Sequence, residues 1–92
     1  MLTAIVMVRT EPDRIPEAAQ EISELSGISE VYSVTGEWDL IVMVRVRQHD
    51  ELADVIADRL SKIEGVVETV TQIAFRTYSR HDLEDAFSLG MD

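Results

Sequence analysis

The pentapeptide IVMVR occurs at residues 5–9 and again at residues 41–45 of this 92-residue chain. Its branched and apolar residues favour a β-strand, so each copy predicts one strand. Neither copy alternates between polar and apolar residues, as a strand does when one of its faces lies in water. The repeat therefore indicates two related halves whose central strands are covered on both faces.

The segments around the repeat predict the element order β-α-β-β-α-β. Strands are expected at residues 2–9, 31–35, 38–47 and 66–79, with one helix after the first strand and another after the third. Apolar residues recur at helical spacing in both helices, as Ile15, Ala18, Ala19, Ile22 and Leu25 and as Leu52, Val55, Ile56, Leu60 and Ile63. We expect Asp13 and Asp50 to cap these helices and Gly27 and Gly65 to end them.

Two further features agree with a duplicated unit. GISEV at 27–31 resembles GVVET at 65–69, and each segment follows a predicted helix. Gly36 and Glu37 are expected to form a two-residue type II′ turn between the second and third strands. The sequence thus predicts an α+β fold of the ferredoxin-like kind, with an antiparallel sheet in which both copies of IVMVR are central strands.

The side chains of the central strands divide between the two faces of this sheet. One face carries Val6, Val8, Val42, Val44 and Val46, and the other carries Ile5, Met7, Ile41 and Met43. Two helices cover one face only, so the other would expose an apolar patch on the order of several hundred Å2, which soluble monomers rarely show. We expect a second copy of the chain to cover this face, giving at least a dimer. The alternative is that residues 79–92 fold back over the sheet.

The charge balance limits the partners of the chain. It has 18 acidic and 8 basic residues, and its formal net charge of −10 opposes direct contact with nucleic acid. It contains no cysteine, which fits a reducing compartment. Its N-terminal segment shows neither a basic leader nor an apolar run long enough to cross a bilayer. We therefore expect a single cytoplasmic domain with no membrane and no direct nucleic-acid partner.

Residue types that carry catalysis are sparse. His49 and His81 stand alone, so neither is given a catalytic role. Three acidic residues share one face of the first predicted helix, Glu17, Glu21 and Glu24. Such a face is typical of a solvated surface rather than of a cation site, and neither a metal nor a cofactor is expected. Asp39 is different, because a charge within an apolar strand either meets a cation or backbone donors or lies at the wet end of the strand.

The segment VTGEWDLIVMV at 34–44 resembles the Gly-x-[Tyr/Trp]-Asp-hydrophobic signature of the effector-binding domain of the Lrp/AsnC family, called the RAM domain. The element order agrees with that domain over residues 1–78, and so does the threonine-bearing last strand, VETVTQIAF. Full-length members carry an N-terminal helix-turn-helix domain, so the chain resembles a stand-alone RAM domain. The resemblance implies subunits that pair into a dimeric α/β barrel, dimers that join into rings such as octamers, and amino acids or related small metabolites bound where dimers meet.

The resemblance also implies a ligand-binding site around the hairpin. The matching positions are Thr35, Gly36, Glu37, Trp38, Asp39, Thr69 and Thr71. Asp39 would meet the ammonium group of an amino acid, while backbone N–H groups near Gly36 and the threonine hydroxyls would meet its carboxylate. The other hairpin residues would shape the site.

Three functions are consistent with these observations. The first is a non-enzymatic regulatory module that binds a small metabolite, senses an amino acid, and acts through its own assembly or through co-assembly with a DNA-binding relative. The second is a small enzyme on the same barrel scaffold, of the cofactor-free monooxygenase or isomerase type, although the apolar interior argues against it. The third is a structural oligomer without a ligand. Residues 79–92 form either a short helix, supported by Leu83 and Phe87, or a frayed acidic tail.

Overall fold

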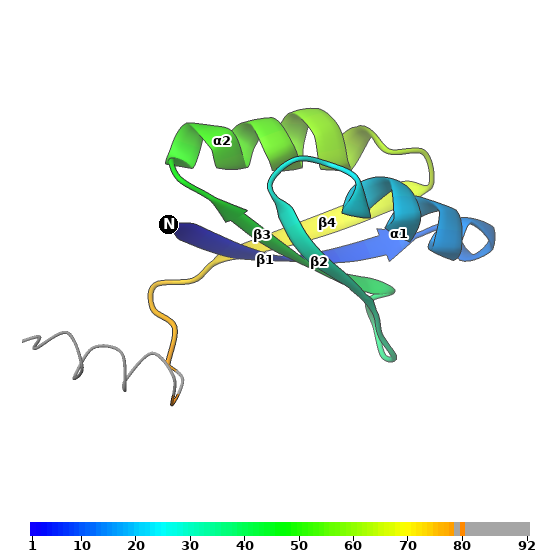
Figure 1. Ribbon diagram of the computed structural model, residues 1–92. Helices are drawn as coiled ribbons and strands as arrows, with labels where there is room; N and C mark the ends of the chain where they lie inside the picture. The colour runs from blue at the N-terminus through cyan, green and yellow to red at the C-terminus, as the bar shows by residue number, and fades with distance from the viewer. Residues whose placement is uncertain (79, 81–92) are drawn as a thin grey trace, which may run out of the picture.

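The computed structural model describes residues 1–78 and 80 and has the element order β-α-β-β-α-β (Figure 1). The strands are β1 (Leu2–Thr10), β2 (Ile28–Ser33), β3 (Leu40–Val46) and β4 (Val66–Ile73). A short 3-10 turn, η1 (Pro12–Arg14), leads into helix α1 (Ile15–Ser23). The second helix begins as α2 (His49–Ala53), continues as the π-helical segment η2 (Asp54–Arg59) and ends in the 3-10 turn η3 (Leu60–Lys62).

The two copies of IVMVR pair with each other at the centre of the sheet. The strand order is β2-β3-β1-β4, and every neighbouring pair is antiparallel. Val6 lies opposite Val42, and Met7 lies opposite Ile41. The expected ferredoxin-like topology, with both copies as central strands, is therefore confirmed.

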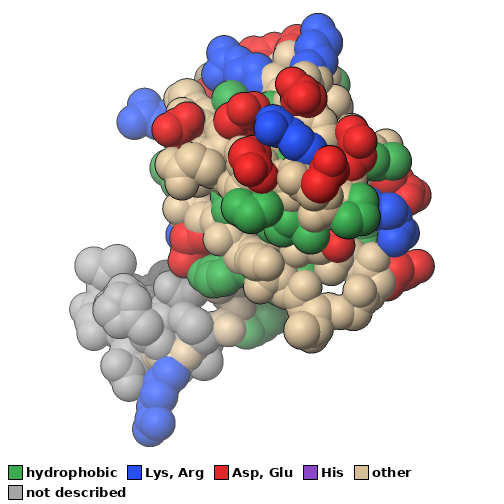
Figure 2. Space-filling model, turned by 90° about the vertical axis from the view of Figure 1, so that its right-hand side faces the viewer, with side chains coloured by type: hydrophobic (Ala, Val, Ile, Leu, Met, Phe, Trp, Pro, Cys, Tyr) green, Lys and Arg blue, Asp and Glu red, His purple; other side chains and the backbone are tan. Residues whose placement is uncertain are grey.

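Both helices lie on one face of the sheet, above it in Figure 1, and the core forms between them and the strands. The buried core residues are Ala4, Val6, Val8, Ala18, Ile22, Leu40, Val42, Val44, Val46, Leu52, Val55 and Leu60. The valines assigned to one face by the sequence pattern are thus buried beneath the helices. Figure 2 shows charged side chains crowded over the helical side of the molecule, with hydrophobic side chains emerging below them.

The opposite face of the sheet has no helix of the described residues over it. Ile5, Met7, Ile41 and Met43 lie on this face and are only partly buried. Beside them, the exposed Tyr32 donates a hydrogen bond of 2.5 Å from its hydroxyl group to Glu30 Oε2. That hydrogen bond is the main cause that raises the pKa of Tyr32, because the carboxylate favours the protonated phenol.

Two glycines occupy equivalent places in the two halves. Gly27 (φ +93°) precedes β2 and Gly65 (φ +95°) precedes β4, so the similar segments GISEV and GVVET do have the same structural role. A Cβ atom on Gly27 would lie 2.9 Å from Val55 Cγ2, and one on Gly65 would lie 2.7 Å from Arg14 Cβ. Both positions thus need glycine for the backbone conformation and for the close packing.

Several expected boundaries are wrong. Asp13 lies inside η1 and Asp50 inside α2, and the cap positions are taken by Arg14 and Gln48 without a side-chain hydrogen bond. β2 begins at Ile28 rather than at residue 31, because it pairs with β3 directly after the glycine turn. β4 ends at Ile73 rather than at residue 79: its last paired residue lies opposite Ala4, the main-chain N–H of Ala74 still donates to the carbonyl oxygen of Thr3, and β1 begins at Leu2, so a strand that ran to residue 79 would pass its start.

The connection between β2 and β3 also differs from the expected two-residue turn. β2 ends at Ser33 and β3 begins at Leu40, which leaves a six-residue loop, residues 34–39.

Within the described residues, no helix is long and apolar enough to cross a membrane. The expectations for residues 79–92 fall, apart from Arg80, outside the described residues.

Substitution of two glycines separates backbone strain from packing. Gly36 also has positive φ (+108°), but nothing lies within 4 Å of an added Cβ there. We expect Gly36→Ala to lower the free energy of unfolding by about 1 kcal/mol through strain alone, and Gly27→Ala to lower it by about 2–4 kcal/mol through strain and overpacking. Urea denaturation measures both values. Equal losses at the two positions would contradict the packing role of Gly27.

Candidate functional site

The loop between β2 and β3, residues 34–39, carries most of the expected site residues. The main-chain N–H of Val34 donates to the carbonyl oxygen of Asp39 at 3.1 Å and so closes the loop at its base. Thr35 and Gly36 lie at the exposed tip, where positive φ makes glycine the favoured residue. The tip therefore presents main-chain groups to solvent, on a base that is fixed to the sheet.

Asp39 anchors this loop to the end of β1. Its main-chain N–H donates to the carbonyl oxygen of Val8 at 3.0 Å, and its Oδ2 accepts a hydrogen bond of 2.8 Å from the main-chain N–H of Thr10. A backbone donor therefore meets this carboxylate, as one of the sequence-based interpretations held. Because β3 begins at Leu40, Asp39 lies just before the strand rather than inside it.

Two polar atoms beside this anchor make no hydrogen bond to the described residues. Asp39 Oδ1 accepts no hydrogen bond from any of the described residues. Thr10 is only 5% exposed, and its hydroxyl oxygen has no hydrogen-bond partner in the part of the chain that the structure describes. The carboxylate of Asp39 thus keeps one oxygen that can accept a further hydrogen bond where the loop meets β1, whereas the hydroxyl group of Thr10 is buried.

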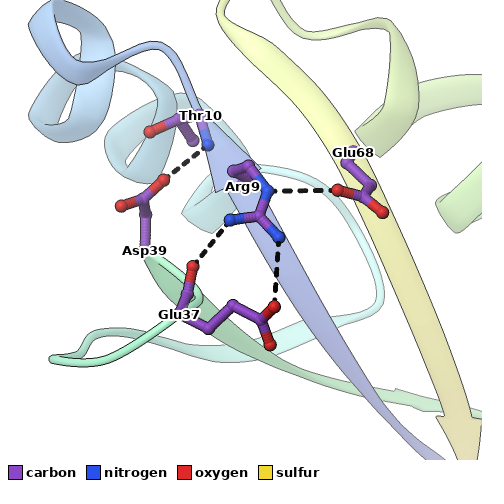
Figure 3. A network of polar contacts seen from close by, with 5 residues as sticks. All are labelled: Arg9, Thr10, Glu37, Asp39 and Glu68. Carbon is purple, nitrogen blue, oxygen red and sulfur yellow. Dashed lines mark hydrogen bonds and ion pairs between the residues drawn. The ribbon is translucent and has the colours of Figure 1, made fainter.

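Arg9 makes the other contacts of a polar network that comprises Arg9, Thr10, Glu37, Asp39 and Glu68 (Figure 3). Its Nη1 donates to the main-chain oxygen of Glu37 at 2.9 Å, and its Nε donates to Glu68 Oε1 on β4 at 3.0 Å. Its guanidinium carbon lies 4.6 Å from the centre of the Trp38 ring, a favourable cation–π distance. Arg9 therefore joins the loop to the far edge strand across the end of β1.

Sequence reasoning missed Arg9 and Glu68. A signal was present, because Arg9 ends the first IVMVR copy on the same face as Ile5 and Met7, and a cation there needs an acceptor or water. The pairing of β4 with β1 then places Glu68 directly opposite Arg9. That register was not specified by the residue pattern, so the acceptor could not be named.

The network carries more negative than positive charge. It contains three carboxylates, those of Glu37, Asp39 and Glu68, and one guanidinium group, that of Arg9. The side chains of Glu37 and Glu68 are 73% and 53% exposed, so their ion pairs with Arg9 are screened by water and salt. The local field thus favours an additional cationic group over an anionic one.

The two threonines of β4 lie apart from this network. Thr69 pairs with Val8 and Thr71 pairs with Val6, and residues directly opposite in a sheet point to the same face. Both valines are fully buried under the helices, so the threonines belong to the helical face of the edge strand. Arg9 and Glu68 point to the other face. A single chain therefore does not bring the threonines and the Arg9 network together on one face.

Neither of two cavities found in the molecule lies at this loop. One of about 160 Å3 lies between the turn after α1 and the second helix, and one of about 370 Å3 lies along α1 beside Pro16, Glu17, Gln20 and Glu21. Within residues 1–78 and 80, no three His, Asp or Glu side chains are grouped closely enough to hold a metal ion. The loop of one chain alone is thus an open surface rather than an enclosed site.

The fold and the Gly-x-x-Asp loop define a class of small α+β ligand-binding domains, and the comparisons give the family. The family model described as the Lrp/AsnC ligand binding domain matches residues 3–83. The chain belongs to this family, as its resemblance to the RAM domain implied. The HTH-type transcriptional regulator PH1916 of Pyrococcus horikoshii is 38% identical over 78 residues, which are 82% of this chain and 52% of that protein.

Solved structures agree with this assignment. The structure of TTHA0845 from Thermus thermophilus is similar with a TM-score of 0.82 and 42% identity, over 87% of this chain and all of that one. The transcriptional regulator NMB0573 of Neisseria meningitidis, solved as a complex with L-Met, has the same fold with a TM-score of 0.77 at 16% identity, over 86% of this chain and 53% of that one. The chain spans about half the length of the curated relatives it matches. These relatives are named as transcriptional regulators, which agrees with a non-enzymatic domain.

Removal of the Asp39 side chain tests the anchor. We expect Asp39→Ala to lower the free energy of unfolding by about 1–3 kcal/mol, because it leaves the Thr10 N–H without its acceptor. Asp39→Asn keeps an acceptor oxygen and should lose less than half as much. Glu37→Ala is the matched control, since it removes an exposed carboxylate but keeps the main-chain acceptor of Arg9, and it should change the stability by about 0.5 kcal/mol or less. A loss for Glu37→Ala as large as that for Asp39→Ala in urea denaturation would show that the ion pair, and not Asp39, holds the loop.

Proposed function

We propose that this chain is a regulatory module that binds an amino acid at the loop of residues 34–39 and responds through its state of assembly. The observation that carries this proposal is the anchored loop itself. Asp39 is fixed by Thr10 but keeps one carboxylate oxygen free, next to the exposed main chain around Gly36. An α-amino acid offers an ammonium group for the first and a carboxylate for the second.

The excess of negative charge supports the orientation of such a ligand. Three carboxylates against one guanidinium group attract the ammonium end. The main-chain N–H groups at the tip of the loop are available to the carboxylate end, where a glycine permits close approach of the ligand. Thr35, Glu37 and Trp38, which belong to the same loop, form the rest of the edge of the proposed ligand site.

The separation of the threonines from the loop supports a site shared between copies. Thr69 and Thr71 lie on the helical face of the edge strand, whereas the Arg9 network lies on the other face. A ligand that touches both sets therefore takes the loop from one chain and the hydroxyl groups from another. Such a site couples binding to assembly, because a ligand shifts an equilibrium by its different affinities for the two states.

The uncovered sheet face supports pairing of the chains into a dimeric α/β barrel. Its apolar residues Ile5, Met7, Ile41 and Met43 form one contiguous patch across β1 and β3. Burial of apolar surface contributes roughly 25 cal/mol per Å2, so pairing two such faces supplies a large driving force. Association of dimers into a ring such as an octamer would then bring the loops of different dimers together.

Two observations on relatives support an amino acid as the ligand and transcriptional regulation as the role. NMB0573, which has the same fold, was solved with L-Met. Relatives about twice as long are named as HTH-type transcriptional regulators. With a net charge of −10, this domain is unsuited to contact DNA itself, so we propose that it acts in the cytoplasm by co-assembly with a DNA-binding relative.

A ligand screen tests the binding function. We expect at least one of the twenty amino acids to raise the melting temperature of the protein and to change its mass in light scattering, because the ligand binds between copies. Asp39→Asn should abolish both responses while the chain stays folded and dimeric. If no amino acid changes either quantity, or if Asp39→Asn responds like the natural protein, the proposed site is wrong.

A single charge on the uncovered face tests the dimer. We expect Met43→Glu to convert the protein to a monomer in sedimentation at micromolar concentration, because an unpaired carboxylate cannot be buried between the sheets. Ala57→Glu is the matched control, since it adds the same charge at an exposed position of the second helix and should leave the mass unchanged. A natural protein that already sediments as a folded monomer would contradict the proposed assembly.

A further inference from the structure

Three consecutive residues at the end of β1 hold the loop between β2 and β3, and they do so in different ways. The carbonyl oxygen of Val8 and the main-chain N–H of Thr10 both bond to Asp39. These two contacts use main-chain groups of β1, whose positions follow from the pairing of the strands. Arg9, between them, holds the loop through its side chain, which donates to the main-chain oxygen of Glu37 at 2.9 Å. Its contact therefore depends on the surroundings of a guanidinium group rather than on the backbone.

Arg9 shares this side chain between the loop and the edge strand β4, as Figure 3 shows. Its Nε donates to Glu68 Oε1 at 3.0 Å, while its Nη1 donates to the loop. β4 has a bulge at the same point, because its register with β1 shifts directly after Arg9 and Val67 has no residue opposite it. Bulges occur frequently next to functional sites, where they redirect a side chain. The guanidinium group thus bridges two segments that lie on opposite sides of β1.

Arg9 lies at one end of the apolar patch on the uncovered face of the sheet. Met7, two residues earlier on β1, belongs to this patch, and successive residues on one face of a strand are about 7 Å apart. Val70 on β4 lies opposite Met7, is 38% exposed and widens the patch toward Glu68. A second copy that covers the patch therefore comes close to Arg9 and Glu68 as well.

In a single chain, water weakens the contacts of Arg9. The side chain of Arg9 is 36% exposed and that of Glu68 is 53% exposed, so water and salt screen their ion pair. The attraction between two charges rises about fourfold when the effective dielectric constant falls from about 80 to about 20. A second copy at the end of the patch would displace water from the guanidinium group. Pairing of the sheets therefore strengthens the hold of Arg9 on the loop.

Arginine is suited to this bridge by the shape of its side chain. The Nε and Nη1 donors point to two acceptors at once, and the flat guanidinium group lies over the Trp38 ring, 4.6 Å from its centre. The ammonium group of a lysine is a single point of charge on a flexible stem. A lysine at this position would keep the charge but could not hold Glu37 and Glu68 together. Arg9→Lys thus separates the bridge from the charge.

We propose that Arg9 is a positioning residue that couples the pairing of the sheets to the shape of the ligand loop. The proposal rests on the proposed function, because it uses the sheet-to-sheet pair and describes how the amino-acid site would be regulated. In a single chain the bridge opens readily and the main chain at Glu37 moves, whereas in the pair the bridge stays closed. A ligand that requires the closed loop favours the pair, and by linkage the pair favours the ligand to the same extent.

Backbone NMR relaxation of the loop tests this coupling without any ligand. We expect the amide order parameters of residues 36–38 to be about 0.8 or more in the paired natural protein and below about 0.7 in monomeric Met43→Glu. The Nε–H proton of Arg9 should also exchange with water at least about fivefold more slowly in the pair. In Arg9→Lys the difference between the paired and the Met43→Glu forms should fall to less than half, which closes a double-mutant cycle.

Two further variants keep the comparison sound. Arg59→Lys is the matched control, since it makes the same substitution at an exposed position of the second helix and should preserve the full difference. Sedimentation sets a concentration at which the natural protein and Arg9→Lys are both paired. Should Arg9→Lys fail to pair at any concentration, Glu68→Gln takes its place, because it removes the charge that Arg9 shares with β4 and leaves the apolar patch intact.

The outcomes distinguish the coupling from the binding function. An amino-acid screen without a response leaves this experiment unaffected, because no ligand enters it. Equal order parameters of residues 36–38 in the natural pair and in Met43→Glu would overturn the proposal, since pairing would then not reach the loop. An undiminished difference in Arg9→Lys would overturn it too, because the second copy would then order the loop by direct contact. A natural protein that does not pair at all would contradict both this coupling and the proposed assembly.

Discussion

The pairing of β1 with β3 is the contact on which the rest of the molecule depends. It sets two copies of the same pentapeptide antiparallel, so that valine meets valine on the helical face and isoleucine meets methionine on the other. Because each strand is apolar on both faces, the sheet needs cover on both sides. The two helices meet that need on one side and bury the valines completely. The loop of residues 34–39 begins where this pair of strands ends, so its position follows directly from their register.

Much of this architecture could be predicted from the residues. The repeat, the helical spacing and the glycines at 27 and 65 were enough for the element order and for the division of β1 and β3 into two faces. The predictions that were wrong, for the helix caps and for the turn between β2 and β3, concern features that depend on tertiary contacts. Asp13 and Asp50 have the side chains of helix caps, but the chain enters both helices at other residues. The prediction of a two-residue turn was wrong. Asp39 is bonded to the end of β1, because its main-chain N–H donates to Val8 and its carboxylate accepts from Thr10, and the connection between β2 and β3 is a longer loop.

The arrangement of the candidate site could be predicted only for residues that lie close together in sequence. Gly36 and Asp39 are recognisable from their spacing, and the structure gives both a clear role in the loop. Arg9 and Glu68 come from strands that the sequence separates by almost sixty residues, and only the register of β4 brings them together. The same register sets Thr69 on the face opposite Arg9. A pattern of residue types does not specify which face an edge strand presents, so this separation could not be foreseen.

The apolar face of the sheet that the helices leave uncovered has a further consequence when it is considered together with the strong negative charge of the chain. Copies that carry a charge of −10 repel one another in most mutual orientations, which keeps the protein dispersed in a crowded solution. Only an encounter that removes a large hydrocarbon area from water overcomes this repulsion. In the assembly proposed above, electrostatic repulsion would thus oppose indiscriminate association, and the sheet face that the described helices leave uncovered is where the burial of apolar area can offset that repulsion.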